Sequence, residues 1–447
     1  MKIFHCLNHF LPNNVAGTEI YTASLIHFLS LKNINSVVVI PNYGKPDTEE
    51  YTVNGIRVIQ YGEPSVIDRK LIMGKKIPEG IEAFKKVLET EKPDIIQFHV
   101  AGMSNGITRH HVSLSKKMGF KTIMTFHIAG YSCKTNHLMY KDKVPCDGVI
   151  DVKKCTWCNY TVRGIPRIKR HILYASAMAG YTLNYDTSNW ESQIGTALGF
   201  PFIIKKLKND LLQLAGNCDK MVVISNWYKN ILLRNGIAED KLELITQGLP
   251  LQENNIVPPK IKIAEGVKLV FIGRIIYSKG LHLLINALKQ LPEKNISLDI
   301  YGHINEDDYT KECIAQSADI KSIRWKGILL PAELLNILKN YDLLCIPSVI
   351  CEMSPLVIQQ AFAAGIPVLA SEVYGNSEQI TDSLNGWLFK FKNSDDLKIK
   401  LEQLVAEPGK IQEAKKNIPA VRNFSAVADE YEQLYRRIIN TGREINN

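Results

Sequence analysis

Two cations placed just before a predicted helix are the first candidates for chemistry in this sequence. Arg274 follows Gly273 at the end of an apolar run, and Lys279 comes shortly before the helical pattern of Leu281–Leu291. The free N–H groups and the dipole of a helix N-terminus add to such charges and favour an anion. We therefore expect a diphosphate site here. The alternative is a solvated Arg and Lys in an ordinary connection.

An acidic residue stands in a second segment of the same kind, between a predicted strand and a predicted helix. Pro355 suits the first helical turn and Ser354 suits its cap, so that the N–H groups of that turn would face a ligand. Glu352 would then lie at the lip of the crevice that open parallel sheets form beyond the carboxyl ends of their strands. The alternative is an ordinary acidic residue near a helix start.

Four of the nine cysteines gather in a polar segment, and two of them have the C-x-x-C spacing that lets two thiolates bind one ion. A structural zinc, an iron–sulfur cluster and free thiols are the alternatives, with His137 as a further candidate ligand. The scattered cysteines are expected to be small buried hydrophobes. The clustered four are Cys133, Cys146, Cys155 and Cys158.

Short apolar runs alternate with helical patterns along most of the chain, which predicts mostly parallel sheets covered by helices on both faces. One series of predicted strands covers residues 2–7, 37–40, 94–98, 121–126 and 221–225, and a second covers 268–273, 297–301, 322–326, 342–347 and 367–371. The fold class is therefore α/β, with two doubly wound sheets.

The polar segment Gln252–Lys262 lacks an apolar period and is expected to link two lobes. We assign residues 1–252 to an N-terminal α/β lobe, with a cysteine-bearing basic insertion at about 131–211. Residues 263–423 are assigned to a C-terminal α/β lobe. Residues 424–447 are assigned to a last helix that would return to the first lobe.

The composition is that of a folded chain, with 45% hydrophobic and 22% charged residues, and it excludes disorder as the main state. The start lacks the unbroken apolar core of a secretory signal, so Met1 is expected to begin the folded protein in the cytoplasm. The sequence contains no run of about 18 uncharged apolar residues, which excludes transmembrane transport.

Most of the net charge of +9 is local, because residues 134–208 hold 12 Lys+Arg against 5 Asp+Glu. Such basic stretches with apolar neighbours can lie on the anionic inner face of a membrane, where each cation is worth about 1 kcal/mol. The alternative is a solvated basic face. Nucleic acid is not an expected partner, since no recognised binding motif accompanies the charge. The cations concerned are Arg163, Arg167, Lys169, Arg170, Lys205, Lys206 and Lys208.

Several motifs closely resemble glycosyltransferase family 4. They are Gly273-Arg274 with Lys279-Gly280, Glu352–Ile358 with Ala361–Val368, and Asn385–Phe389; the loop Gly17-Thr18-Glu19 and Thr125-Phe126-His127 are similar to the family's first lobe. The resemblance implies the GT-B fold, two Rossmann-like lobes facing across a cleft. It also implies metal-independent transfer of a sugar from a nucleotide diphosphate, with retention of configuration. Residues 1–252 would then be the Rossmann-like lobe that binds the acceptor, and residues 263–423 the Rossmann-like lobe that binds the nucleotide sugar.

The resemblance also implies roles for individual residues. Arg274 and Lys279 would bind the donor diphosphate and stabilise the leaving group, Glu352 would hold hydroxyls of the donor sugar, and His127 would touch that sugar. Gly17 would let the backbone approach the diphosphate. Further residues of the donor site would be Gly273, Met353, Ser354, Pro355, Leu356 and Gln360.

Gln360 departs from the family pattern, which has a second glutamate at this position to bind the ribose hydroxyls. A neutral amide loses the charge-assisted pair that a carboxylate offers a diol. We expect altered nucleotide binding. The chain as a whole is expected to be a transferase for a lipid-linked or polysaccharide acceptor in cell-surface glycan synthesis, and the rival is a non-catalytic nucleotide-sugar-binding protein.

We predict that the four clustered cysteines hold one metal ion, because their segment is too polar to order itself and zinc binding contributes about 10–16 kcal/mol to small folded units. Metal analysis of protein purified without added zinc should find close to one ion per chain. The double variant Cys155→Ser, Cys158→Ser should lose the metal and acceptor-dependent transfer while donor binding survives. Fully active, metal-free wild-type protein would refute this prediction.

Overall fold

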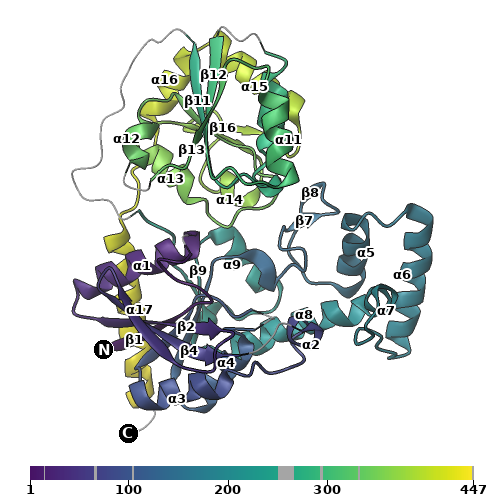
Figure 1. Ribbon diagram of the computed structural model, residues 1–447, viewed down its shortest axis with the longest axis vertical. Coiled ribbons are helices and arrows are strands. Elements are labelled where there is room, and N and C mark those ends of the chain that lie inside the picture. Colours follow the sequence, from purple (N-terminus) through teal and green to yellow (C-terminus); the bar gives the residue numbers. More distant parts are fainter. Residues whose placement is uncertain are drawn as a thin grey trace. The chain divides into compact units, whose positions relative to one another are not determined.

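The computed structural model describes residues 1–14, 16–64, 68–102, 105–249, 266–291, 295–330 and 333–444. The chain divides into two compact units (Figure 1). The first unit consists of Met1–Asn136, Asp147–Thr246 and Phe424–Asn447, and the second of His137–Cys146 and Gln247–Asn423. The predicted linker Gln252–Lys262 lies outside the described residues.

The first unit is built on an 8-stranded sheet with the order β10-β9-β6-β5-β1-β2-β4-β3, and only β3 pairs antiparallel within its described strands. Its central strands are buried on both faces, as expected of a parallel sheet covered by helices. The strands are β1 (Lys2–Cys6), β2 (Asn35–Tyr43), β3 (Glu49–Val53), β4 (Ile56–Glu63), β5 (Ile95–Phe98), β6 (Lys121–Phe126), β9 (Lys220–Val223) and β10 (Leu242–Leu244).

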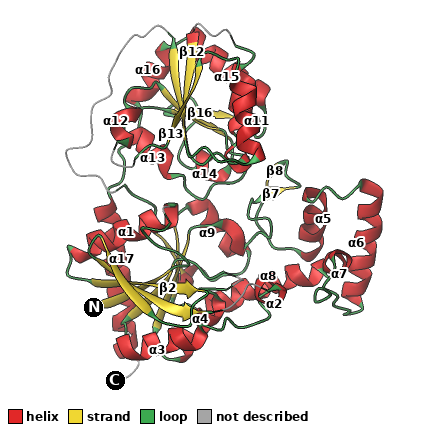
Figure 2. Cartoon of the chain, in the orientation of Figure 1, coloured by secondary structure: helices red, strands yellow, loops and turns green. Residues whose placement is uncertain are grey.

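Helices cover this sheet and also form most of the insertion from Val152 onwards (Figure 2). Covering helices are α1 (Gly17–Ser30), α2 (Arg69–Ile72), α3 (Ile81–Glu91), α4 (Arg109–Lys117), α9 (Asn226–Arg234) and α17 (Phe424–Glu444). Insertion helices are α5 (Val152–Val162), α6 (Arg167–Thr182), α7 (Gln193–Leu198) and α8 (Phe200–Asn217). Within the described part of the chain, no helix has the length and apolar character needed to cross a bilayer.

The second unit holds a fully parallel 6-stranded sheet with the order β13-β12-β11-β14-β15-β16. Its strands are β11 (Val267–Ile272), β12 (Ile296–Tyr301), β13 (Ile323–Gly327), β14 (Leu343–Ile346), β15 (Val368–Ser371) and β16 (Gly386–Phe389). Its helices are α10 (Leu281–Leu288), α11 (Asp308–Ser317), α12 (Leu334–Leu338), α13 (Leu356–Ala363), α14 (Tyr374–Ser377), α15 (Ser394–Ala406) and α16 (Gly409–Lys416).

The structure differs from the predicted division at one segment of the insertion. A short hairpin, β7 (Met139–Tyr140) and β8 (Val144–Pro145), belongs to the second unit. The backbone N–H of Cys351 donates to the carbonyl of His137 at 3.0 Å, and Lys392 pairs with Asp142. These contacts join residues far apart in the sequence, so no local sequence pattern predicts them.

The last described helix, α17, completes the core of the first unit. The Tyr431 hydroxyl lies 3.1 Å from that of Tyr21 and 3.2 Å from the hydroxyl of Thr125, and the Tyr435 hydroxyl donates to Gln97. Both tyrosines are fully buried. The helix therefore forms part of this unit's interior.

Three histidines form a hydrogen-bonded chain where β1, β5 and β6 lie side by side. Nδ1 of His5 lies 3.1 Å from Nε2 of His99, whose Nδ1 lies 3.0 Å from Nε2 of His127. The other end of the chain is Ser36, whose hydroxyl lies 3.2 Å from Nε2 of His5. Burial lowers the pKa of His5 and of His127 to about 3, and it lowers the pKa of His99 well below its usual value. All three imidazoles are therefore neutral at neutral pH.

We expect the first unit to lose stability as the pH falls from about 6.5 towards 3. An unfolded histidine titrates near 6.5, so protons bind the unfolded chain before the buried imidazoles. At about pH 5, each of His5 and His127 should lower the free energy of unfolding by about 2 kcal/mol relative to neutral pH. Urea unfolding followed by circular dichroism between about pH 7.5 and 5 measures the loss.

The matched control for this prediction is His27, an exposed histidine of α1. His5→Gln should make the free energy of unfolding less dependent on pH, whereas His27→Gln should leave the dependence as it is in the wild type. Equal pH dependence in the wild type and in His5→Gln would contradict the prediction.

Candidate functional site

A close backbone approach shapes the candidate donor site of the second unit. Gly280 begins α10 with φ +70°, a conformation that L side chains rarely adopt, and a Cβ there would overlap the carbonyl oxygen of Pro347. The N–H of Val349 donates to the carbonyl of Ser278 at 2.9 Å, which ties the same two loops together. The loops that follow β11 and β14 are thereby held against each other.

Lys279 and Glu352 meet where these two loops touch. Nζ of Lys279 lies 2.7 Å from Oε1 of Glu352, and the Ser348 hydroxyl donates to the same oxygen at 2.7 Å. Ser348 is itself held by the hydroxyl of Ser371, which donates to its carbonyl at 2.7 Å. No described residue donates to Oε2 of Glu352, so this oxygen can accept a hydrogen bond from a ligand.

Arg274 lies on the same edge of the sheet, because it follows β11 and β11 pairs with β14. Its side chain is exposed, and it forms no ion pair within the described ranges. Gly273, the residue before it, is fixed by a backbone hydrogen bond to Tyr301 at 3.1 Å. The guanidinium is therefore free to bind an anion at this edge.

The start of α13 differs from the prediction. The helix begins at Leu356 with Pro355 as its N-cap residue, at φ −65° and ψ 116°, and no side chain caps it. The predicted cap by Ser354 is wrong, because this residue lies one position too early, where its carbonyl accepts from Gln247 at 2.5 Å. The first-turn N–H groups therefore remain without a side-chain cap, as an anion site requires.

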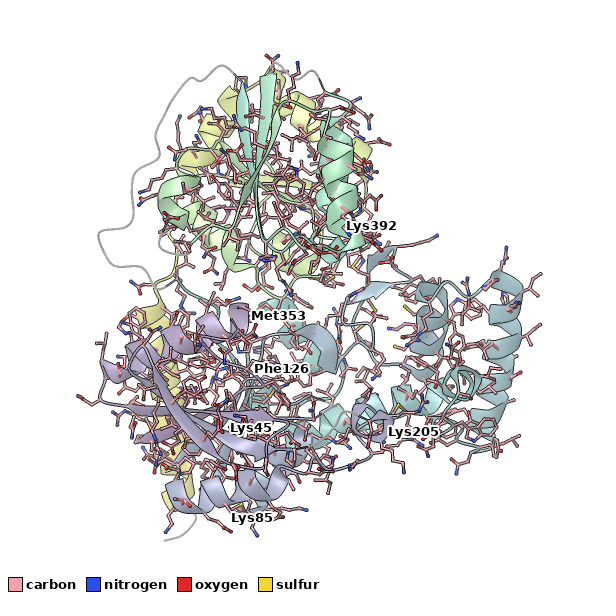
Figure 3. All side chains as sticks on the ribbon, in the orientation of Figure 1. Lys45, Lys85, Phe126, Lys205, Met353 and Lys392 are labelled. Atoms are coloured by element: carbon pink, nitrogen blue, oxygen red, sulfur yellow. The ribbon has the colours of Figure 1, made fainter. Side chains whose placement is uncertain are left out.

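Two other predicted donor-site residues belong to this part of the unit. Met353 is buried in the loop before α13 (Figure 3). Gln360 lies one turn into α13 and is partly exposed, and its side-chain amide has no hydrogen-bond partner among the residues described. Ser348 and Ser371 were not predicted as site residues, although Ser348 directly follows one predicted strand and Ser371 ends another.

Gly17 and His127 are the predicted site residues that belong to the first unit. A Cβ on Gly17, the first residue of α1, would meet no described atom within 4 Å, so packing does not require a glycine there. The ring of Tyr21 packs edge-on against His127 with 4.8 Å between centroids.

The hydrogen bond to His99 leaves one ring nitrogen of His127 for a ligand. Its Nε2 faces His99, so Nδ1 is the remaining atom. Each neutral imidazole carries one N–H, so the hydrogen bonds from Ser36 to His127 can all point in either of two directions. If Ser36 donates, Nδ1 of His127 bears the proton; if His127 donates through Nε2, Nδ1 is an acceptor.

The clustered cysteines are not brought together as a ligand set. Within the described ranges, no three His, Cys, Asp or Glu side chains could hold a metal ion together. Cys155 and Cys158 lie on α5, Cys133 contacts the Thr135 hydroxyl at 3.2 Å, and Cys146 belongs to the second unit. The structural zinc therefore stays a prediction from the sequence.

Known glycosyltransferases are similar to this chain in sequence. Residues 253–421 match the family model described as "Glycosyl transferases group 1". The amylovoran biosynthesis glycosyltransferase AmsK of Erwinia amylovora is 22% identical over 279 residues, which are 60% of this chain and 65% of that protein. The matches span about three fifths of the length of the first curated relatives, 60%, 59% and 65%.

Solved structures match over nearly the whole chain. Sucrose-phosphate synthase from Thermosynechococcus elongatus has a TM-score of 0.66 at 17% identity, covering 98% of this chain and 99% of that one. Anabaena Alr3699/HepE in complex with UDP-glucose has a TM-score of 0.57 at 14% identity, covering 99% and 100%. The predicted fold class is confirmed: the chain has the two-lobed α/β fold of GT-B glycosyltransferases.

Proposed function

We propose that this protein is a retaining, metal-independent glycosyltransferase that moves a sugar from a nucleotide diphosphate to a lipid-linked or polysaccharide acceptor. The observation that carries the proposal is the pairing of Lys279 with Glu352 beside two helix starts, in the segment that matches the glycosyltransferase family model. A cation, a carboxylate and free N–H groups in one place suit a ligand that joins a diphosphate to a polyol.

The proposed step is a displacement at the anomeric carbon of the donor sugar. The bond from this carbon to the diphosphate oxygen breaks, its electron pair stays on the diphosphate, and the acceptor hydroxyl forms the new bond on the same face. The hydroxyl proton passes to the departing phosphate oxygen. Arg274 and Lys279 stabilise the charge that develops on the leaving group, which fixed cations do without reorganisation.

The remaining residues orient the two substrates. Glu352 accepts hydrogen bonds from sugar hydroxyls through its open Oε2, and Gly17 leaves room for the diphosphate. His127 contacts the transferring sugar through Nδ1 as a neutral group, because its pKa is lowered to about 3. The complexes of HepE with UDP-glucose make UDP-sugars the first donors to test, and AmsK, a glycosyltransferase of amylovoran biosynthesis, supports a glycan acceptor.

A second candidate function is nucleotide-sugar binding without transfer. Gln360 favours it, because an amide stands where the family pattern has a ribose-binding carboxylate. Radiolabelled UDP-, GDP- and ADP-sugars, incubated with and without lipid extract, separate the two functions. Labelled product or free sugar supports the transferase, whereas saturable donor binding with no turnover supports the binding protein.

We predict that Arg274→Ala and Lys279→Ala each lower kcat by about 10²–10³, as loss of a charge-stabilising donor does in other enzymes. The fold should survive, because Arg274 is exposed and Lys279 is partly so. Steady-state kinetics with the preferred donor measures the loss, and circular dichroism checks the fold.

Lys289→Ala is the matched control for these two variants, since this exposed lysine lies at the other end of α10. It should keep wild-type kcat. Near-native turnover in both Arg274→Ala and Lys279→Ala would contradict the assigned site.

Gln360→Glu should tighten donor binding if the amide simply replaces a ribose-binding carboxylate, because a carboxylate makes stronger hydrogen bonds to a diol. Calorimetric titration with the donor measures the change. Gln290→Glu adds the same charge to an exposed position after α10 and should leave the affinity unaltered. Weaker binding in Gln360→Glu would mean that the pocket is built around the amide.

A further inference from the structure

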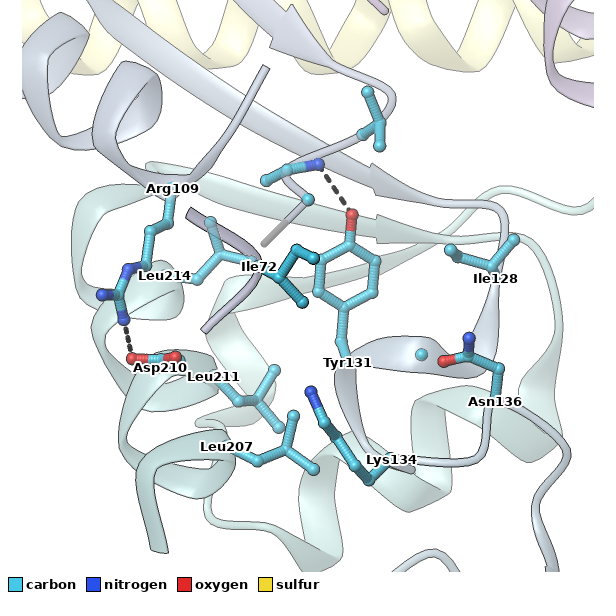
Figure 4. A pocket seen from close by; sticks show the side chains of 14 residues that line it. Ile72, Arg109, Ile128, Tyr131, Lys134, Asn136, Leu207, Asp210, Leu211 and Leu214 are labelled. Carbon is cyan, nitrogen blue, oxygen red and sulfur yellow. Dashed lines mark hydrogen bonds and ion pairs between the residues drawn. The ribbon is translucent and has the colours of Figure 1, made fainter. Parts of the chain in front are cut away.

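A cavity of 310 Å³ opens in the first unit at the carboxyl ends of β5 and β6 (Figure 4). Val100, Ala101 and Gly102 follow His99 into its wall, and Ile128 directly follows His127. The hydroxyl of Tyr131 accepts from the N–H of Ala101 at 2.7 Å and holds the two loops together. The cavity therefore begins beside the histidine that would touch the donor sugar.

One wall of this cavity is apolar. Leu207, Leu211 and Leu214 recur at helical spacing along α8 and turn the same face towards the cavity, and Ile72 of α2 also lines it. The volume is about twice that of the ~150 Å³ apolar cavity that accepts a benzene molecule. It falls within the range of ordinary ligand pockets. An apolar group of several carbons can therefore fit here.

A second cavity of 370 Å³ adjoins the first and shares Arg109, Lys134 and Asp210 with it. Its lining is basic, with five cations against two carboxylates. The carboxylates are Asp186 and Asp210, and the cations are Lys75, Arg109, Lys134, Lys205 and Lys206. Lys205 projects from α8 in Figure 3.

The charges of this second cavity are unevenly paired. Asp210 forms ion pairs with both Arg109 and Lys206, the latter at 2.9 Å. Among the residues that the structure describes, Lys75 donates only to the neutral side chains of Ser188 and Asn189. Lys134, which lines both cavities, has no hydrogen-bond or ion-pair partner within the part of the chain described, and its side chain points into the first cavity (Figure 4). The second cavity therefore carries an excess of positive charge.

The pKa values of two lysines are consistent with this excess of positive charge. The pKa of Lys206 is lowered to about 8, first by burial and then by Arg109, Lys75 and Lys134, although Asp210 lies beside it. Burial, and then Arg163, also lower the pKa of Lys134. A bound anion would relieve the repulsion among these cations.

The neighbouring helices carry apolar side chains on their surface. Ile168 and Ile172 of α6 are 77% and 64% exposed, and Ile194 of α7 is 70% exposed. Arg167 and Lys169 are exposed on α6 as well. Exposed aliphatic groups among cations are typical of a surface that meets anionic lipid.

We propose that the two adjoining cavities bind a phosphate or diphosphate ester of an apolar chain. The phosphate lies among Lys75, Lys134 and Lys206, and the first carbons of the chain lie against Leu207, Leu211 and Leu214. The identification of this ligand as the acceptor rests on the proposed function, because the acceptor is then an anionic lipid whose phosphate anchors it beside His127. The binding site itself does not depend on that function.

Calorimetric titration with decyl phosphate, below the concentration at which it forms micelles, tests the site without turnover. Inorganic phosphate and decanol represent the two halves of the ligand. Decyl phosphate should bind about tenfold tighter than either half, or more, because both cavities contribute. Inorganic phosphate that binds as tightly as the ester would overturn the apolar part of the proposal.

Two variants test the phosphate and the apolar part of the site separately, and a third variant is a control. Lys134→Met keeps most of the side chain and should weaken decyl phosphate binding by about tenfold. Ile72→Ser, at a half-exposed position, should weaken the ester but not inorganic phosphate. Lys208→Met removes an exposed cation of α8 that does not line either cavity, and it should have no effect. Equal weakening by Lys134→Met and Lys208→Met would overturn the proposal.

The outcome is distinguishable from a failure of the proposed function. Tight decyl phosphate binding without transfer of labelled sugar would support this site and refute the transferase. Transfer to a phosphate-free glycan by Lys134→Met at the wild-type rate, with no binding of decyl phosphate to the wild type, would refute this site and support the transferase.

Discussion

The close contact between Gly280 and the carbonyl of Pro347 is the constraint on which the candidate donor site depends. Any side chain at Gly280 would push apart the loops that follow β11 and β14. Lys279 and Glu352 come from these two loops and meet at 2.7 Å. Because the carboxylate is also held by Ser348, the geometry of the charged pair is set by backbone packing, and a ligand meets an arrangement that is already formed.

The two units prepare opposite electrostatic environments. The second unit keeps a lysine, an arginine and a glutamate at the edge of its sheet, where water and ligand can reach them. In the first unit, His5 and His99 are buried in the core and His127 is partly buried at its edge, and desolvation keeps all three uncharged at neutral pH. A cationic edge suits an anionic ligand, whereas neutral imidazoles suit hydrogen bonds to uncharged groups.

The sequence predicted the features that depend on neighbouring residues. Arg274, Lys279 and Glu352 were placed after strands because apolar runs and helix starts can be recognised within a few neighbouring residues of the sequence. The histidine chain was out of reach, because it needs the register of β1 against β5 and of β5 against β6. The same holds for the cavity along α8 and for the hairpin at β7 and β8, since both join segments distant in the chain. The predicted cap of α13 was wrong for a local reason: Pro355 is the N-cap residue, so the helix starts one residue later than predicted.

The place of α17 in the first unit bears on how the chain folds as it leaves the ribosome. Residues 424–444 bring Tyr431 and Tyr435 into a core whose other members, such as Tyr21 and Gln97, are made much earlier. Synthesis of the intervening residues 247–423 takes roughly 10–35 s at about 5–20 residues per second. During that time the nascent first unit lacks a buried helix and exposes apolar surface, so chaperones would meet it before the second unit is finished.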